Sequence, residues 1–161
     1  MPSINMNIVN QHEQMCKFSC IPSAVELVLK LLGRVKEDYY NLQDEWGNKK
    51  DGGFCDFHEK TIEGVYFTQH FALPRNAQFP LKELFQMIDG ELSQGRYVIV
   101  SLAPKNGWHM SVIFDKEETG EYIAITKHYE QTIHVKNIQQ LIVRMQGTDI
   151  LVYGDSRPTS G

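Results

Sequence analysis

The chain has 161 residues and a formal net charge of −4, with 42% hydrophobic and 22% charged residues. This composition is typical of one globular domain that can bury a core, and it excludes a disordered chain. The chain has no basic run, so nucleic acid is not expected as a partner. We predict a single domain over residues 1–154 and a disordered tail over residues 155–161.

The amino-terminal segment MPSINMNIVNQHEQ lacks the charged and apolar regions of a secretory signal. No apolar run approaches the roughly 20 residues that a membrane-spanning helix needs. The three cysteines favour free thiols in a reducing compartment. We expect a chain without a membrane span that is cytoplasmic, or exported without a cleavable signal.

The first half of the chain predicts mainly helices. Pro22 to Leu32 is almost wholly apolar and Gly33 follows it, which predicts a buried central helix. Ser19 is placed to cap this helix, and Pro22 suits its first turn. Further helices are predicted over 37–46 and 79–94, with a loop over 47–54, while 61–71 fits helix and strand equally well.

The second half predicts short strands, a typical α+β order. The apolar runs RYVIVSLA and WHMSVIF predict two strands, and YIAIT is the expected hairpin partner of the second. Two more strands, TIHV and DILVYG, flank a short helix over 138–143. We therefore expect an antiparallel sheet behind an amino-terminal helical part.

Cys20 is the first candidate for chemistry, because it stands where the central helix begins. Unpaired N–H groups and the positive end of the helix dipole both favour the thiolate, which is the reactive form of cysteine. A packed residue at the helix start is the alternative interpretation, since free cysteines are often buried. Cys16 lies before Cys20 in a predicted loop and is expected to be structural.

His109 is the candidate base and Gln14 the candidate oxyanion donor. His109 begins a predicted strand directly after the turn-like APKNGW, so it would be held rigidly and remain accessible. Gln14 lies in a loop that could fold back beside Cys20, where its amide would join the Cys20 N–H; Gln11 is a weaker rival.

These residues resemble the papain-like cysteine peptidases, and most closely the double-glycine leader peptidase domains and their C39-like relatives. The similar features are Gln14, five intervening residues, Cys20, and then Pro22 ahead of an apolar helix. The segment QGRYVIVSLAPKNGWHMSVIF also follows the order of the family, and the resemblance runs from about Gln14 to Tyr153. Ile21 and Tyr97 stand where the family has Gly and Pro. The resemblance implies a papain-like fold with Cys20 as nucleophile, His109 as base and Gln14 as oxyanion donor.

One departure concerns the residue that orients the histidine. The family carries an Asp or Asn on the partner strand, but the corresponding window here is AITK, with Ile125 and Thr126. Asp115 is expected at the far end of the His109 strand, out of reach. Thr126 would be a neutral orienting group, and a Cys–His dyad or a third member such as Glu130 or Gln131 stays open.

A zinc site is the competing hypothesis, since Cys16, Cys20, Cys55 and His58 supply four soft ligands. The three-residue spacing between the first two cysteines argues against it, and a disulfide between them is a weaker alternative. We expect Cys55 and His58 to be structural. Trp108 would line a cleft or pack, and Tyr39, Tyr40 and Trp46 are typical anchors of a helix to a core.

The sequence thus predicts a cysteine hydrolase that cleaves the amide bond of a peptide or protein substrate through a thioester, without a metal or organic cofactor. The same chemistry would serve a glutamine deamidase or a transglutaminase-like effector. A third hypothesis, favoured by the missing Asp or Asn, is a catalytically inactive binding module.

Overall fold

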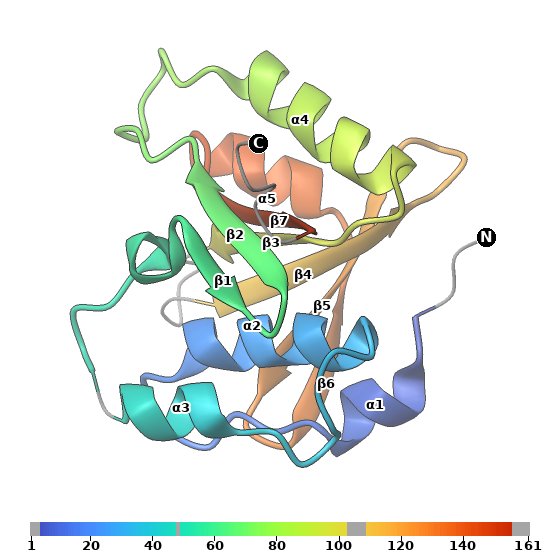
Figure 1. The fold of residues 1–161 in the computed structure, drawn as a ribbon. Coiled ribbons are helices and arrows are strands. Elements are labelled where there is room, and N and C mark those ends of the chain that lie inside the picture. Colours follow the sequence, from blue (N-terminus) through green and yellow to red (C-terminus); the bar gives the residue numbers. More distant parts are fainter. Residues whose placement is uncertain (1–3, 48, 103–108, 156–161) are drawn as a thin grey trace, which may run out of the picture.

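The computed structural model describes residues 4–47, 49–102 and 109–155, and its strands form one antiparallel sheet (Figure 1). The strand order is β1-β2-β7-β3-β4-β5-β6. The strands are β1 (Lys60–Ile62), β2 (Val65–His70), β3 (Val98–Leu102), β4 (His109–Lys116), β5 (Tyr122–His128), β6 (Gln131–Val135) and β7 (Ile150–Asp155). The predicted antiparallel sheet and its β4–β5 hairpin are confirmed.

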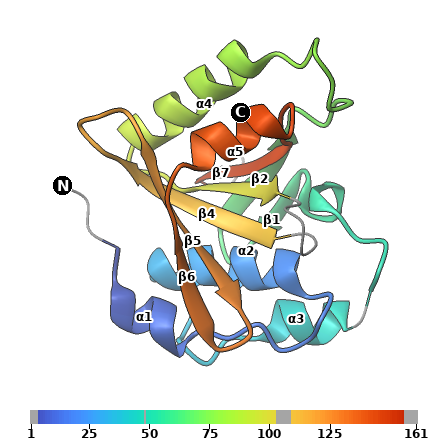
Figure 2. The same ribbon diagram turned by 180° about the vertical axis from the view of Figure 1, so that it is seen from behind.

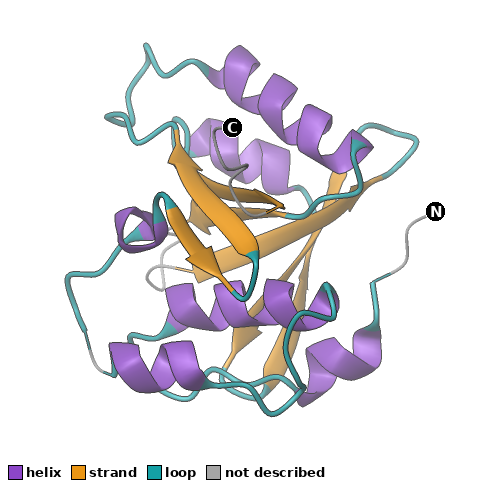
Figure 3. Cartoon of the chain, in the orientation of Figure 1, coloured by secondary structure: helices purple, strands orange, loops and turns teal. Residues whose placement is uncertain are grey.

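Helices lie on both sides of the sheet (Figures 1 and 3). One side carries α1 (Met6–Gln11), α2 (Cys20–Leu31) and α3 (Asn41–Trp46), and the other carries α4 (Leu81–Ser93) and α5 (Ile138–Arg144). A short 3-10 helix, η1 (Phe54–Phe57), precedes β1. The mixed helix and sheet content matches the prediction, although β1 and β2 come before α4 rather than after all the helices.

Each side of the sheet has its own hydrophobic core, because side chains alternate along a strand. Met110 and Val112 of β4 belong to the core that includes α2. Ile113 belongs instead to the core that includes α4 and α5. This alternation decides which residues at the start of β4 face α2.

Helix α2 is the buried centre of its side, as the apolar pattern predicts. Every residue from Ile21 to Lys30 is buried, including the charged residues Glu26 and Lys30. These charges are accommodated by fully buried His12, whose Nδ1 lies 2.9 Å from Lys30 Nζ, and by Gln43 of α3, whose Nε2 donates to Glu26 Oε1 at 2.7 Å. The polar groups therefore tie the chain before and after α2 to this helix.

Two local predictions need correction, and one segment left open is resolved. Ser19 is the N-cap residue of α2, but its side chain makes no capping hydrogen bond and lies 2.9 Å from Gln43 Oε1 instead. Helix α3 begins at Asn41 rather than at residue 37. Residues 61–71 form most of a β-hairpin, in which Ile62 pairs with Val65.

The predicted tail over 155–161 begins one residue too early, because Asp155 is the last residue of β7. The predictions on APKNGW (103–108) and on the rest of the tail (156–161) fall outside the described residues. In the part of the chain that the structure describes, no helix combines the length and the hydrophobicity needed to cross a membrane.

Candidate active site

Cys20 is the first residue of α2. The amino-terminal end of this helix lies beside the start of β4 (Figures 1 and 2). Helix α2 begins with the hydrogen bond that Ser23 N donates to Ser19 O at 2.9 Å. Pro22 suits the first turn because the backbone N–H that it lacks would have no acceptor within the helix. Burial raises the pKa of the Cys20 thiol above 9.0, and hydrogen bonds to it from the backbone N–H groups of Ile21 and Cys20 only partly oppose this. The thiol is therefore protonated at neutral pH.

A cleft of about 800 Å³ opens at this end of α2, and the three candidate residues Gln14, Cys20 and His109 all line it. Aromatic side chains from the flanking loops and α3 also line the cleft, among them Phe18 and Trp46. The Trp46 ring is fixed because its Nε1 donates to Phe18 O at 2.9 Å. A cavity of this size can hold several residues of a peptide.

His109 is the first residue of β4 and reaches the cleft from the end of the strand. Successive side chains of β4 point to opposite faces of the sheet, so the His109 side chain has the same orientation as those of Ser111 and Ile113. This is the face that carries α4 and α5, opposite to the face of Met110. No hydrogen bond joins Cys20 to His109 among those that the described residues make. Burial, and then the charge of His128, lower the pKa of His109 below 6.5, so its imidazole is neutral at neutral pH.

His128, not Thr126, stands opposite His109 on the partner strand. The β4–β5 register pairs Ser111 with Thr126, and their side-chain oxygens lie 2.6 Å apart. Continuing that register brings His109 beside His128, with ring centroids 6.0 Å apart. The prediction that Thr126 orients the histidine is therefore wrong.

The other proposed third members do not adjoin His109 either. Asp115 pairs with Ile123 at the far end of the hairpin, as expected. Gln131 lies on β6, one strand further from His109 than β5, and pairs there with His128. Glu130 is an exposed residue of the β5–β6 turn. Among the described residues His109 has an imidazole, and no carboxylate, as its neighbour across the strand pair.

Gln14 is buried in the cleft wall, but its amide is already engaged. Its Nε2 donates to Cys16 O at 2.8 Å and to Lys17 O at 3.2 Å. Its backbone N donates to Tyr129 O at 3.0 Å, which joins this loop to the β5–β6 turn. In this geometry Gln14 holds the loop before Cys20 and has no N–H left for an oxyanion.

Lys127 is a residue of the site that sequence reasoning missed. With Met110 it lies on the α2 side of the sheet, and both line a small hollow next to Cys20. Burial lowers the pKa of Lys127, and the charge of Glu13 opposes this. Its Nζ donates to Thr132 Oγ1 at 2.8 Å. Only the strand register, which the sequence does not reveal, could have placed Lys127 there.

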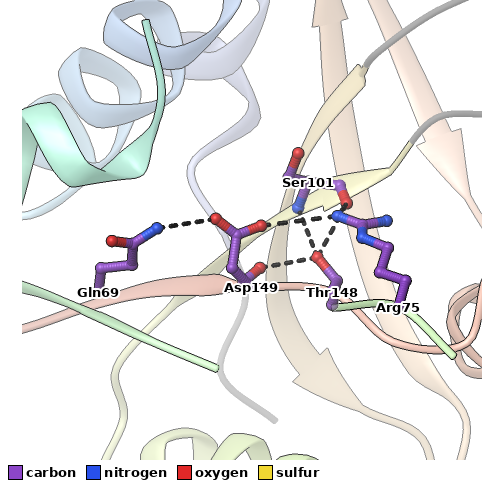
Figure 4. A network of polar contacts seen from close by, with 5 residues as sticks. All are labelled: Gln69, Arg75, Ser101, Thr148 and Asp149. Carbon is purple, nitrogen blue, oxygen red and sulfur yellow. Dashed lines mark hydrogen bonds and ion pairs between the residues drawn. The ribbon is translucent and has the colours of Figure 1, made fainter. Parts of the chain in front are cut away.

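The far wall of the cleft is a polar network built from four separate segments (Figure 4). Asp149 accepts a hydrogen bond from Gln69 Nε2 at 3.0 Å and lies 3.6 Å from Arg75 Nη2. Arg75 also donates to Ser101 O at 2.8 Å, and Ser101 N donates to Thr148 Oγ1 at 3.0 Å. The network fixes Arg75 and Asp149 at the cleft surface, where both line it.

The zinc hypothesis finds no support in the geometry. Within the described ranges no three His, Cys, Asp or Glu side chains are grouped to hold a metal ion. Cys16, Cys20 and Cys55 are all free thiols, and Cys55 is exposed on η1. His58 Nδ1 accepts a hydrogen bond from Gln69 N at 2.9 Å, which is a structural contact at the hairpin.

Comparison with known proteins gives no relative: no family model, no curated protein and no solved structure matches the chain. The site must therefore be interpreted from its own residues.

Proposed function

We propose that this chain is a papain-like cysteine hydrolase that cleaves an amide bond, with Cys20 as nucleophile and His109 as general base. The observation that carries the proposal is that a thiol at a helix start and an imidazole at a strand start line one cleft. This pairing on a helix and an antiparallel sheet is what the resemblance to papain-like enzymes implies.

The protonation states favour general-base catalysis over a resting ion pair. The raised pKa of the Cys20 thiol and the lowered pKa of His109 together leave a neutral thiol and a neutral imidazole. His109 would take the proton of the Cys20 thiol as the sulfur attacks the amide carbonyl. This step requires the His109 ring to turn toward Cys20, and catalytic hydrogen bonds often shorten only when substrate is bound.

The oxyanion formed by this attack would lie at the start of α2, where the first backbone N–H groups of a helix have no acceptor within the helix. His109 then returns the proton to the leaving amine as the carbon–nitrogen bond breaks and a thioester remains. Water, deprotonated by His109, cleaves the thioester and restores the thiol. Gln14 would join as a donor only after its amide leaves Cys16 and Lys17.

An inactive papain-like binding module is the second candidate. It is favoured by the engaged amide of Gln14 and by His128 in place of a carboxylate beside His109. Deamidation would use the same proposed thioester, with a glutamine side chain as the substrate and water as the acceptor. Acyl transfer would also use it, with an amine in place of water as the acceptor.

The experiment measures alkylation of each cysteine by iodoacetamide at neutral pH, read by mass spectrometry. We expect His109→Ala to slow alkylation of Cys20 by about a hundredfold or more, the lower end of the usual scale of general-base assistance. Exposed Cys55 should be unaffected and serves as the internal control. His134→Ala, an exposed histidine on β6, is the matched variant and should leave Cys20 unchanged. An equal Cys20 rate in wild type and His109→Ala would reject the hydrolase and leave the binding module.

A further inference from the structure

The cleft at Cys20 is cationic, although the chain as a whole carries a net charge of −4. Of the residues that the structure describes, the basic side chains that line the cleft are Lys17, Lys49, Lys50, Arg75 and Lys127. The acidic lining of the same described residues is Asp149 alone. The charge of the cleft is thus opposite in sign to that of the molecule.

Some of these cations are already balanced. Arg75 lies 3.6 Å from Asp149, and Lys49 Nζ lies 2.8 Å from Asp56. Lys127 is buried, and its Nζ donates to two neutral oxygens, Glu130 O in the β5–β6 turn and Thr132 Oγ1 on β6. Arg75, Lys49 and Lys127 are therefore mainly structural residues of the cleft wall, and their charges are less available to a ligand.

Lys17 and Lys50 are different. Neither forms an ion pair with a carboxylate of the described residues, and both side chains are exposed. Their Nζ atoms lie 5.5 and 5.6 Å from the centroid of the same ring, that of Phe18. The two ammonium groups come from segments before α2 and after α3, so an anion close to the Phe18 ring would be attracted by both.

Helix α2 adds to this field. It has 12 residues, its positive end is at Cys20, and its first turn contains no acidic side chain. An anionic group beside Lys17, three positions before Cys20, would be attracted both by the two lysine ammonium groups and by the positive end of the helix dipole.

We propose that the cleft binds an acidic peptide segment, with Asp or Glu side chains held by Lys17 and Lys50 over Phe18, beside the amide bond that Cys20 attacks. This inference rests on the proposed function for the role of Cys20, but the binding preference itself requires no catalysis. A peptide is favoured over nucleic acid because the proposed chemistry acts on an amide. In addition, the exposed cations without a carboxylate partner in the described part of the cleft are Lys17 and Lys50, rather than a long basic stripe.

The test uses the full chain with Cys20→Ala, so that nothing is cleaved, and three fluorescein-labelled octapeptides of Gly with Glu, Gln or Lys. Fluorescence anisotropy at low salt should show the Glu peptide binding about tenfold more tightly than the Gln peptide, the effect expected of two exposed ion pairs. The preference should decline as NaCl is added. Lys17→Gln with Lys50→Gln should abolish it, whereas Lys82→Gln, which removes an exposed charge on α4, should not.

The outcomes separate this inference from the proposed function. Equal binding of the Glu and Gln peptides, no binding of the Glu peptide, or a preference that survives in the double variant would overturn the acidic-peptide inference. A single-stranded oligothymidylate that binds more tightly than the Glu peptide would also overturn it. None of these results affects the dependence of Cys20 alkylation on His109, which alone tests the hydrolase.

Discussion

At the scale of single residues, the pair His109 and His128 sets the pH range of the proposed chemistry. Their rings lie 6.0 Å apart across the β4–β5 ladder, so a positive charge on His128 disfavours the charged form of His109. Burial and this neighbour lower the pKa of His109 below 6.5. A base that must be neutral therefore remains competent in mildly acidic solution.

We expect the His109-dependent alkylation of Cys20 to fall with a midpoint below pH 6.5 as the solution is acidified. His128→Gln removes the like charge, so the pKa of His109 should rise toward its ordinary value and the midpoint should move up with it. The alkylation rate and the NMR titration of the His109 ring proton would both report this shift. His134→Gln is the matched control. A midpoint that does not move in His128→Gln would show that His128 does not tune His109.

The candidate residues differ in how readable they are from the sequence. Cys20, His109 and Gln14 are recognised by chain order and local context, and the structure brings all three to one cleft. His128 and Lys127 are not recognised, because their places depend on the register of the hairpin. That register shifts at a bulge between Ile113 and Asp115, which no residue type in the turn announces.

At the scale of the elements, long apolar helices and strands are predictable and short polar ones are not. Helix α2 follows from its apolar run, whereas the β1–β2 hairpin has mostly polar, half-exposed strands. Its two-residue turn is Glu63-Gly64, both with positive φ, of 50° and 82°. The usual signal for such a turn is Asn-Gly or Asp-Gly, so the sequence is ambiguous there.

Helix α3 shows how one side chain can hold an element in place. Gln43 is buried and uses both ends of its amide. Its Nε2 donates to Glu13 O and Glu26 Oε1 at 2.8 and 2.7 Å, and its Oε1 accepts from Met15 N at 2.6 Å. It thereby joins α3, α2 and the loop that leads to Cys20.

We expect Gln43→Ala to lower the free energy of unfolding by about 2–4 kcal/mol, because it leaves several buried polar groups without a partner. Urea unfolding would measure this loss. The loop before Cys20 should also loosen, so hydrogen exchange there should quicken. Gln140→Ala, at an exposed position of α5, should change neither quantity. A Gln43→Ala protein as stable as wild type would contradict the role of Gln43 as the central link.

At the scale of the whole molecule, one sheet serves two cores, so neither side is expected to unfold alone. Strand β4 contributes Val112 to the α2 side and Ile113 to the α4 and α5 side. Loss of α2 would expose one face of every strand it covers. The buried ionisable groups on α2 and packed against it should therefore affect the stability of the entire chain.

Two of these groups make stability depend on pH with opposite signs. Burial raises the pKa of Glu26 from 4.5 to about 7, so the folded chain holds an extra proton between these values and stability falls as pH rises through them. Burial, and then the charge of Lys30, lower the pKa of His12 from 6.5 to about 3, so here the unfolded chain holds the extra proton and stability rises with pH.

The two effects oppose each other between pH 4.5 and 6.5, and only Glu26 still titrates between 6.5 and about 7. We therefore expect the free energy of unfolding in urea to be nearly level across the lower interval and to fall across the upper one. Glu26→Gln should remove the fall, because no proton is then released there on unfolding. Glu118→Gln, in the exposed β4–β5 turn, should keep it. The same fall in Glu26→Gln as in wild type would assign this pH dependence to another group.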